Sequence, residues 1–417
     1  MRKTIASLSC AALLLANAAG VLAQTTTVVT NSGSNANISN NSTSTTVVST
    51  QQSNNAVVTQ SSTNMVNTGG NTLSGNIAPG TGCGTCVSGS VDLTTGAGTA
   101  STVQEVDVNK NTAATEVTGG NATSVMDVVN TGNNLNVNAG ATSTTVVGTS
   151  QTNNAMVSQG SMNMVNTGGN DLLNNIGNVS ATTGAGAAGT VQKVTANENT
   201  ALTIVQPAPT TVLPPMCGLN PCLGGLVGGN GTYTVVTNTG KNLNVSNNTN
   251  NTTVVTTGQS NKLFSMQYAG NFVNTGDNLL KKNIGGTSLT TGAGLGTTLM
   301  ELTANKNVAG TAVGSSEMPL GGSLLDVVNT GANANVSAGA TDTTVVGGSQ
   351  TNFSLLWQKT CNVVTTGVNG VLKNIGVTST VTGVAGGGVG QSTTANSNMY
   401  LVTTGPLGLL GLLAFLL

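Results

Sequence analysis

Residues 144–168 read TTVVGTSQTNNAMVSQGSMNMVNTG, and related stretches occur at four places along the chain. Two landmarks identify each copy, a Thr-Thr-Val-Val run near its start and an Asn-Thr-Gly or Thr-Thr-Gly run at its end. The first landmark stands at Thr45–Val48, Thr144–Val147, Thr252–Val255 and Thr343–Val346. The second begins at Asn67, Asn166, Asn274 and Thr365. Self-similarity of this kind predicts a repeat protein.

A further Asn-x-Gly element precedes each closing landmark by the same 36 residues; it begins at Asn31, Asn130, Asn238 and Asn329. Thr and Val favour strands, whereas Asn and Gly favour turns. A rigid spacing held through four copies indicates stacking, because a random coil has no reason to keep it. We therefore expect an all-β chain.

Valines also recur at half of that spacing, since Val29 precedes Val47 by 18 residues and Val128 precedes Val146 by 18. This period predicts a repetitive β-solenoid (β-helix) with coils of about 18 residues. At about 4.8 Å per coil, about twenty coils would form a rod on the order of 100 Å long. Copies one and three resemble each other, as do copies two and four, which indicates a tandem duplication.

The predicted organisation follows these landmarks. It consists of a signal peptide (1–23), copy 1 with a Cys loop (24–124), copy 2 (125–206), a Pro/Gly-rich linker with a second Cys loop (207–232), copy 3 (233–324), copy 4 (325–398) and a hydrophobic tail (399–417).

The composition limits the chemistry. Only 6% of residues are charged, 2% are aromatic and none is His. No Ser-His-Asp triad and no His-ligated metal can form. Disorder is the alternative for so simple a composition, but a mean hydropathy of +0.13 with a net charge of −1 favours a hydrogen-bonded β structure.

Both ends of the chain predict targeting signals. Arg2 and Lys3 precede an apolar stretch and the small-residue end Val21–Ala23, which predicts a secretory signal peptide cleaved before Gln24. The tail Pro406–Leu417 resembles a GPI-attachment signal; the alternative is a tail that caps the fold. We expect a secreted, extracellular protein of the cell surface or cell wall, with membrane attachment only through such a lipid anchor.

Two segments carry a family resemblance. Residues 52–60 (QSNNAVVTQ) and 151–159 (QTNNAMVSQ) resemble the Gln, Asn and Ala spacing of curlin repeats, which build bacterial surface amyloid subunits. A third, altered copy spans residues 259–267, whereas the glycines and the repeat length of that family are missing. The resemblance covers only these segments and implies a stacked β architecture.

Cysteines and sequons predict covalent modification. Cys83 with Cys86, and Cys217 with Cys222, would each close a small disulfide loop in an oxidising compartment, with a redox or metal role for the first pair as the alternative. Cys361 is left over, either buried or free to cross-link to a partner. Predicted N-glycosylation sites are Asn37, Asn121, Asn178, Asn230, Asn244, Asn335 and Asn352.

These features favour a non-enzymatic, structural or adhesive surface protein that forms an extended β-rod without a cofactor. Its expected partners are further copies of itself, the cell wall or the extracellular matrix. Nucleic acid is not expected, because there is neither a basic patch nor a row of stacking aromatic residues.

Two alternatives remain open. One is a β-solenoid that binds ice or polysaccharide on a threonine face, indicated by the steps Thr43/Thr45, Thr142/Thr144 and Thr341/Thr343. The other is a carbohydrate-active enzyme on a parallel β-helix, which would need acids clustered along one groove.

Overall fold

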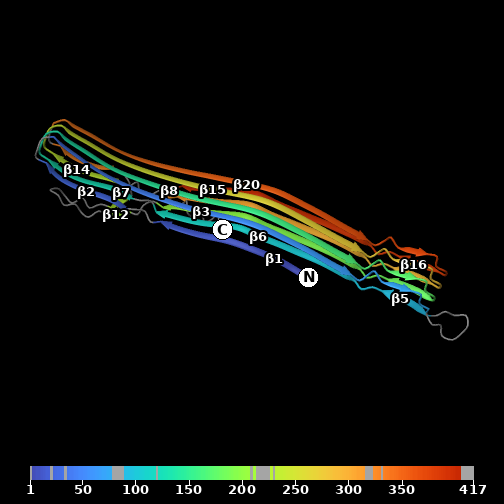
Figure 1. Cartoon of the computed structure of the whole chain (residues 1–417). Coiled ribbons are helices and arrows are strands. Elements are labelled where there is room, and N and C mark those ends of the chain that lie inside the picture. The colour runs from blue at the N-terminus through green and yellow to red at the C-terminus, as the bar shows by residue number, and fades with distance from the viewer. Residues whose placement is uncertain are drawn as a thin grey trace.

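The computed structural model is an elongated all-β molecule in which long parallel strands lie side by side (Figure 1). It describes residues 2–18, 22–31, 35–77, 89–118, 121–206, 210–212, 226–228, 231–314, 323–329 and 332–404. Within this part of the chain no helix is long and apolar enough to cross a bilayer. The prediction of a repetitive β-solenoid is confirmed.

One layer of the molecule is a sheet of four 32-residue strands, which we call the long sheet. In sheet order it comprises β20 (Ala334–Thr365), β15 (Leu243–Asn274), β8 (Leu135–Asn166) and β3 (Ala36–Asn67). At about 3.3 Å per residue each strand spans about 105 Å. The long dimension of the molecule is therefore the strand direction.

Two shorter sheets form the second layer. The facing sheet comprises β1 (Arg2–Ala18), β6 (Gly98–Thr118), β11 (Gly186–Gln206), β18 (Gly294–Val313) and β23 (Ala385–Thr404). The short sheet comprises β19 (Ser323–Asn329), β14 (Gly231–Asn238), β7 (Asn121–Asn130) and β2 (Leu22–Asn31). Hydrogen bonds across the interior place the two in line, because Thr50 contacts Thr115 of β6 and Ser124 of β7 donates to the Asn40 carbonyl.

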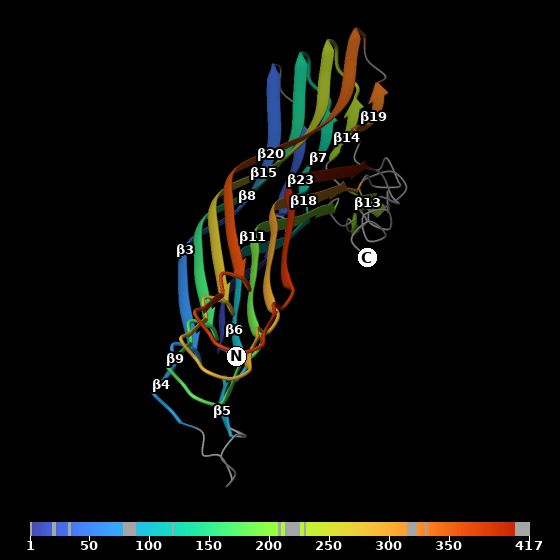
Figure 2. The same cartoon turned by 90° about the vertical axis from the view of Figure 1, so that its right-hand side faces the viewer.

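Small parallel sheets close one end of the molecule (Figure 2). One comprises β4 (Thr72–Ser74), β9 (Asp171–Leu173), β16 (Leu279–Lys281) and β21 (Gly370–Leu372). The other comprises β5 (Ser90–Thr94), β10 (Asn178–Thr182), β17 (Thr287–Thr290) and β22 (Thr378–Val381). In the linker, β12 (Thr210–Val212) pairs with β13 (Leu226–Gly228) in the antiparallel sense.

Each repeat copy forms one complete coil. The four coils run over β2–β6, β7–β11, β14–β18 and β19–β23. Stacked glutamines give the coil length directly, because Gln52, Gln151, Gln259 and Gln350 follow one another at separations of 99, 108 and 91 residues. The predicted coil of about 18 residues is wrong, and so is the predicted stack of about twenty coils.

The physical reason is that each valine pair spans a turn and does not mark equivalent positions in successive coils. Val128 lies on β7 and is fully buried, whereas Val146 lies on β8 on the opposite side of the strand from the buried Val147, so a spacing of 18 does not give the coil length.

Although Asn in general favours turns, Asn40 and Asn54 lie inside β3 and face the interior. The Asn-x-Gly elements were correctly assigned to turns, since Asn67 ends β3 and Asn166 ends β8.

Asparagines with positive φ shape the coil at two levels. Asn35, Asn134, Asn242 and Asn333 have φ of 60–63° and lead into the long strands. Asn109, Asn197, Asn305 and Asn396 have φ of 57–64° inside the facing-sheet strands. Asn tolerates this left-handed conformation better than most residues. At these facing-sheet asparagines two consecutive side chains face inward, as Val108 and Asn109 do. This marks a β-bulge that every coil shares.

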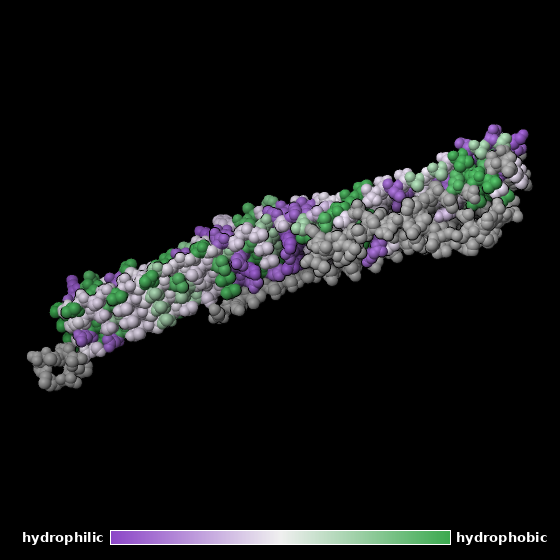
Figure 3. All heavy atoms as spheres, turned by 180° about the vertical axis from the view of Figure 1, so that it is seen from behind, coloured by the Kyte–Doolittle hydropathy of each residue, from purple (hydrophilic) through white to green (hydrophobic). Residues whose placement is uncertain are grey.

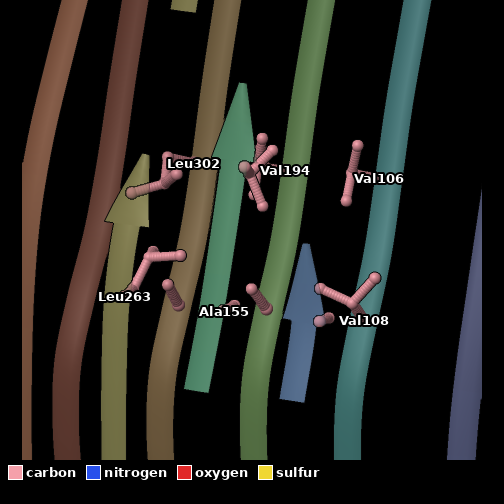
Figure 4. Packing of buried hydrophobic residues seen from close by; sticks show 10 residues of the cluster. Val106, Val108, Ala155, Val194, Leu263 and Leu302 are labelled. Atoms are coloured by element: carbon pink, nitrogen blue, oxygen red, sulfur yellow. The ribbon is translucent and has the colours of Figure 1, made fainter. Parts of the chain in front are cut away.

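The apolar core is a thin layer between the two sheets. Figure 4 shows Leu263 and Ala155 of the long sheet beside Leu302, Val194, Val106 and Val108 of the facing sheet. Each coil contributes between one and five apolar side chains to each such cluster, most of them Ala, Val or Leu. A core this thin buries little apolar surface per residue, so the remaining cohesion has to come from hydrogen bonds.

Candidate functional site: the ends of the coil stack

Glutamine columns run through the interior parallel to the stacking direction. Gln151 Nε2 donates to Gln52 Oε1 over 2.7 Å, Gln259 Nε2 to Gln151 Oε1 over 2.8 Å, and Gln350 Nε2 to Gln259 Oε1 over 2.7 Å. A second column repeats this arrangement at Gln60, Gln159, Gln267 and Gln358. The middle glutamines are almost fully buried, so each amide depends on its neighbouring coils.

A second amide network zigzags between the two sheets. Each side-chain nitrogen donates to the next side-chain oxygen over 2.7–2.9 Å, in the order Asn54, Asn111, Asn153, Asn199, Asn261, Asn307, Asn352 and Asn398. The chain of donors runs from coil 1 to coil 4 without interruption. It links both sheets and all coils in one network.

Each column has a fixed polarity. The asparagine column Asn64, Asn163, Asn271 and Asn362 donates from coil 1 towards coil 4, whereas the glutamine columns donate from coil 4 towards coil 1. Successive coils are therefore related by translation, and the two ends of the stack differ in the hydrogen-bonding groups that they present. An end that presents a donor in one column presents an acceptor in another.

The coil-4 end exposes apolar side chains at positions that are buried in the inner coils. Within the described part of the chain, no strand pairs with the outer edge of β20 or β23. Val336 belongs to the interior column whose members Val137 and Val245 are 0% exposed, yet it is 46% exposed. Val389 and Val402 likewise stand in columns that are buried in coils 2 and 3. These side chains occupy core positions, but no strand among the described residues covers them.

At the coil-1 end only one of the two main sheets is covered. β1 pairs with β6 in parallel over nearly the whole length of β6. The described residues include no strand on the outer edge of β3. β1 lies inside the predicted signal peptide, so the sequence expected to be removed forms the last strand of the facing sheet.

The outer surface offers little conventional chemistry. Most of the face seen in Figure 3 is pale, with apolar and polar side chains in small groups. A shallow hollow of about 500 Å³ crosses the long sheet and is lined only by Gly, Ser and Thr, including Gly148, Thr256 and Gly347. No group of three His, Cys, Asp or Glu side chains converges among the described residues.

Surface ion pairs join neighbouring coils of the facing sheet. Lys110 Nζ lies 3.3 Å from a Glu198 carboxylate oxygen and 3.6 Å from one of Asp107. Partial burial opposes the charge of Lys110, but the two carboxylates outweigh this effect and raise the pKa of the ammonium group. Burial also raises the pKa of the Tyr233 hydroxyl. Neither group lies in a cleft.

The four cysteines predicted to form disulfides, Cys83, Cys86, Cys217 and Cys222, lie outside the described residues. Cys361 is free and half-buried on β20. Of the predicted tail, residues 399–404 belong to β23, and the rest lies outside the described residues.

The predicted glycosylation sites fall into different settings. Asn37, Asn244 and Asn335 share one exposed column with Asn136. In this column Asn136 donates to Asn37, Asn244 donates to Asn136, and Asn335 donates to Asn244. Asn178 is exposed, Asn121 begins β7, and Asn230 lies outside the described residues. Asn352 faces the interior, where its side-chain nitrogen donates to Asn398 and to the Asn305 carbonyl.

In the sequence, the long-sheet glutamines stand out only within the curlin-like segments, and the sequence analysis does not single out the interior asparagines of the facing sheet. The signal that could have identified these asparagines is the recurrence of Asn at equivalent offsets, at Asn111, Asn199, Asn307 and Asn398. Comparison with known proteins adds no further constraint: no family model, curated protein or solved structure matches the chain.

Proposed function

We propose that the protein is a secreted, non-enzymatic structural and adhesive subunit of a cell surface or cell wall, which extends by stacking its coils end to end. The observation that carries the proposal is the open coil-4 end. There, valines in core columns are exposed, and no described strand pairs with the outer edges of β20 and β23. Open strand edges are templates for further pairing.

The two ends match in size. β20 and β3 each have 32 residues, while β23 has 20 and β6 has 21. The differences between coil lengths come from insertions between strands, such as residues 78–88, and not from the strands themselves. Coil 1 of a second copy can therefore lie on coil 4 as coil 4 lies on coil 3.

Amide polarity selects one orientation for this contact. In head-to-tail stacking, Asn362 would donate to the Asn64 position and Gln358 would accept from the Gln60 position of the next copy. Within the molecule, Asn271 donates to Asn362 and Gln267 accepts from Gln358 in the same way. Head-to-head stacking would oppose donor to donor and acceptor to acceptor. Growth is thus expected to be polar.

Signal-peptide removal would prepare the coil-1 end for this contact. In the full-length chain β1 occupies the edge of β6 that the facing sheet of another copy would need. Cleavage before Gln24 removes β1 and frees that edge. Export and assembly competence would then be coupled.

The test compares residues 24–417 with a V336K/V389K variant of the same chain by electron microscopy and sedimentation. The unmodified chain is expected to form filaments whose length grows with concentration. The variant, in which each lysine can reach solvent at the open end, should fold and remain short. Filaments of equal length in both samples, or none in the unmodified chain, would refute end-to-end stacking.

A second candidate function has a specific observation in its favour. The predicted threonine steps form two outward columns on the long sheet, and their members are Thr43, Thr142, Asn250 and Thr341 in one and Thr45, Thr144, Thr252 and Thr343 in the other. Strands about 4.8 Å apart with alternate residues about 6.6 Å apart make a regular hydroxyl array. Such an array could bind ice or a polysaccharide. Ice-recrystallisation assays on wild type and a T45K/T144K variant test it.

A further inference from the structure

The outward face of the long sheet carries an unusual concentration of large side chains. Phe264, Met266 and Tyr268 on β15 lie beside Phe353, Leu355 and Trp357 on β20, and we call these six residues the aromatic patch. It holds four of the eight aromatic residues in the whole chain. Trp357 is 62% exposed and Phe353 is 59% exposed. A contiguous apolar patch of this kind marks an interaction surface.

Charges are divided between the two outward faces. Lys262 and Lys359 flank the aromatic patch and are the only charged side chains among the described outward-facing residues of the long sheet. The described outward face of the facing sheet instead carries five carboxylates and three lysines. These are Glu105, Asp107, Glu116, Glu198 and Glu301, with Lys110, Lys193 and Lys306. One face is therefore positive and the other is net negative.

The two features lie back to back at the same level along the rod. Asn197 Nδ2 donates to the Lys262 carbonyl over 2.7 Å, and Glu198 is the next residue. Asn305 Nδ2 donates to the Phe353 carbonyl over 2.8 Å, and Lys306 is the next residue. A second molecule displaced sideways without an axial shift thus brings Lys262 and Lys359 of one copy onto the part of the facing sheet that carries Glu198 and Glu301, together with Lys306, in the other.

Apolar side chains are present on the facing sheet as well. Leu295, Leu299 and Met399 are exposed large apolar residues on its outward face. The long sheet presents a face of about 19 Å by 100 Å, or about 1,900 Å². A stable interface needs about 800 Å² per partner. The area, the charge and the apolar content of the two faces are therefore sufficient for a specific contact.

We infer that a second copy of this chain docks its facing sheet onto the aromatic patch, so that molecules associate laterally as well as end to end. This inference rests on the proposed structural role and adds a second direction of assembly. Each molecule has one face of each kind, so the contact is heterologous and does not close. The result is a ribbon or bundle of parallel rods.

The deciding experiment uses two charge-reversed variants of the chain that forms filaments. K262E/K359E makes both faces acidic, and E198K/E301K makes both faces basic. Each variant alone should give single filaments without bundles, because like charges then meet across the contact. An equal mixture should restore bundles of wild-type width in electron micrographs. Bundles in either variant alone, or no bundles in the mixture, would overturn the inference.

A second pair of variants tests the aromatic patch. F353N/W357S replaces both residues with those that coil 2 carries at the aligned positions, Asn154 and Ser158. It should raise the concentration at which bundles form by about tenfold or more, since large buried aromatic side chains dominate such interfaces. The matched control V377T removes an 82% exposed valine outside both main sheets and should leave bundling unchanged. Equal effects of the two variants would contradict a specific contact.

Filament length separates this inference from the proposed function. If filaments keep their normal length but bundle width does not respond to charge reversal as described above, only lateral docking is wrong. If filaments do not lengthen, end-to-end stacking is wrong. A pull-down with insoluble cellulose tests the alternative that the aromatic patch binds a polysaccharide. If F353N/W357S loses cellulose binding while bundling is unaffected, the patch serves a polysaccharide and lateral docking is wrong.

Discussion

Coil 4 and the inner coils 2 and 3 have matching strands in the same register, yet they differ in burial. Val245 and Val137 are sealed in the core, whereas Val336 at the same position is 46% exposed. The first third of β20 is exposed on both faces, while in the matching part of β8 every second residue is buried and the residues between them are exposed or half-buried. Burial in this molecule is thus conferred by the neighbouring coil, and a coil without a neighbour keeps core residues in solvent.

The largest contrast is expected at a glycine of the closing turn. A methyl group on Gly276 would overlap the Gly367 carbonyl oxygen, which is backbone and cannot move aside, whereas a methyl group on Gly367 meets nothing within 4 Å. G276A should lose about 3 kcal/mol or more of unfolding free energy, and G367A almost none. Denaturant midpoints measure both. Equal losses would show that the coils do not approach as closely as the structure has them.

The amide network should show the next largest contrast. Asn271 is fully buried; it accepts from Asn163 and donates to Asn362, to the Thr298 hydroxyl and to the Thr297 carbonyl. N271A should cost about 3 kcal/mol, because it leaves several buried groups unsatisfied.

The matched variant N362A removes the same side chain at the open end. It should cost less than about 1 kcal/mol, because water can reach the groups left behind. If thermal or denaturant unfolding gives similar costs for both variants, the interior network does not stabilise the stack.

A smaller contrast is expected in the apolar columns. V245A should cost about 2 kcal/mol through two lost carbon groups and the cavity they leave. V336A should be nearly neutral in the isolated molecule. In filaments the two costs should become similar, because a second copy would cover Val336. Measuring V336A at low and high protein concentration therefore sharpens the comparison and tests stacking at once.

The smallest effect is expected at the surface. K110Q removes an ion pair that joins coils 1 and 2, whereas K306Q removes the aligned lysine, for which no ion pair is found among the described residues. K110Q should cost less than about 1 kcal/mol, and K306Q less still.

The pH dependence follows from the raised pKa of Lys110. A pKa that is higher in the folded state contributes stability in full below the ordinary lysine value of about 10.4, and this contribution is lost as pH rises through the folded value. The difference between wild type and K110Q should therefore be constant at neutral pH and shrink above about pH 10.5. A difference that grows with pH would contradict the ion pair.

Interior amides explain why part of the site could not be predicted. Asn54 and Asn153 are typical turn residues by composition, and only the register of stacked strands shows that they satisfy one another across coils. The stacked glutamines Gln52 and Gln60 lie in one curlin-like segment and share β3, as Gln151 and Gln159 share β8. The facing-sheet partners lie tens of residues away, and their position depends on how the chain returns across the interior.

The sequence by itself determined that this protein is a β-solenoid with four copies and with turns at its Asn-x-Gly elements, because strand and turn preferences act locally. Only the tertiary structure decided that one coil is a whole copy of about a hundred residues, that the long axis follows the strands and that no described strand covers the core positions of coil 4. Coil length depends on which residues pair between copies. Alternation along a strand is the same whether the strand has 5 residues, as β5 has, or 32, as β3 has.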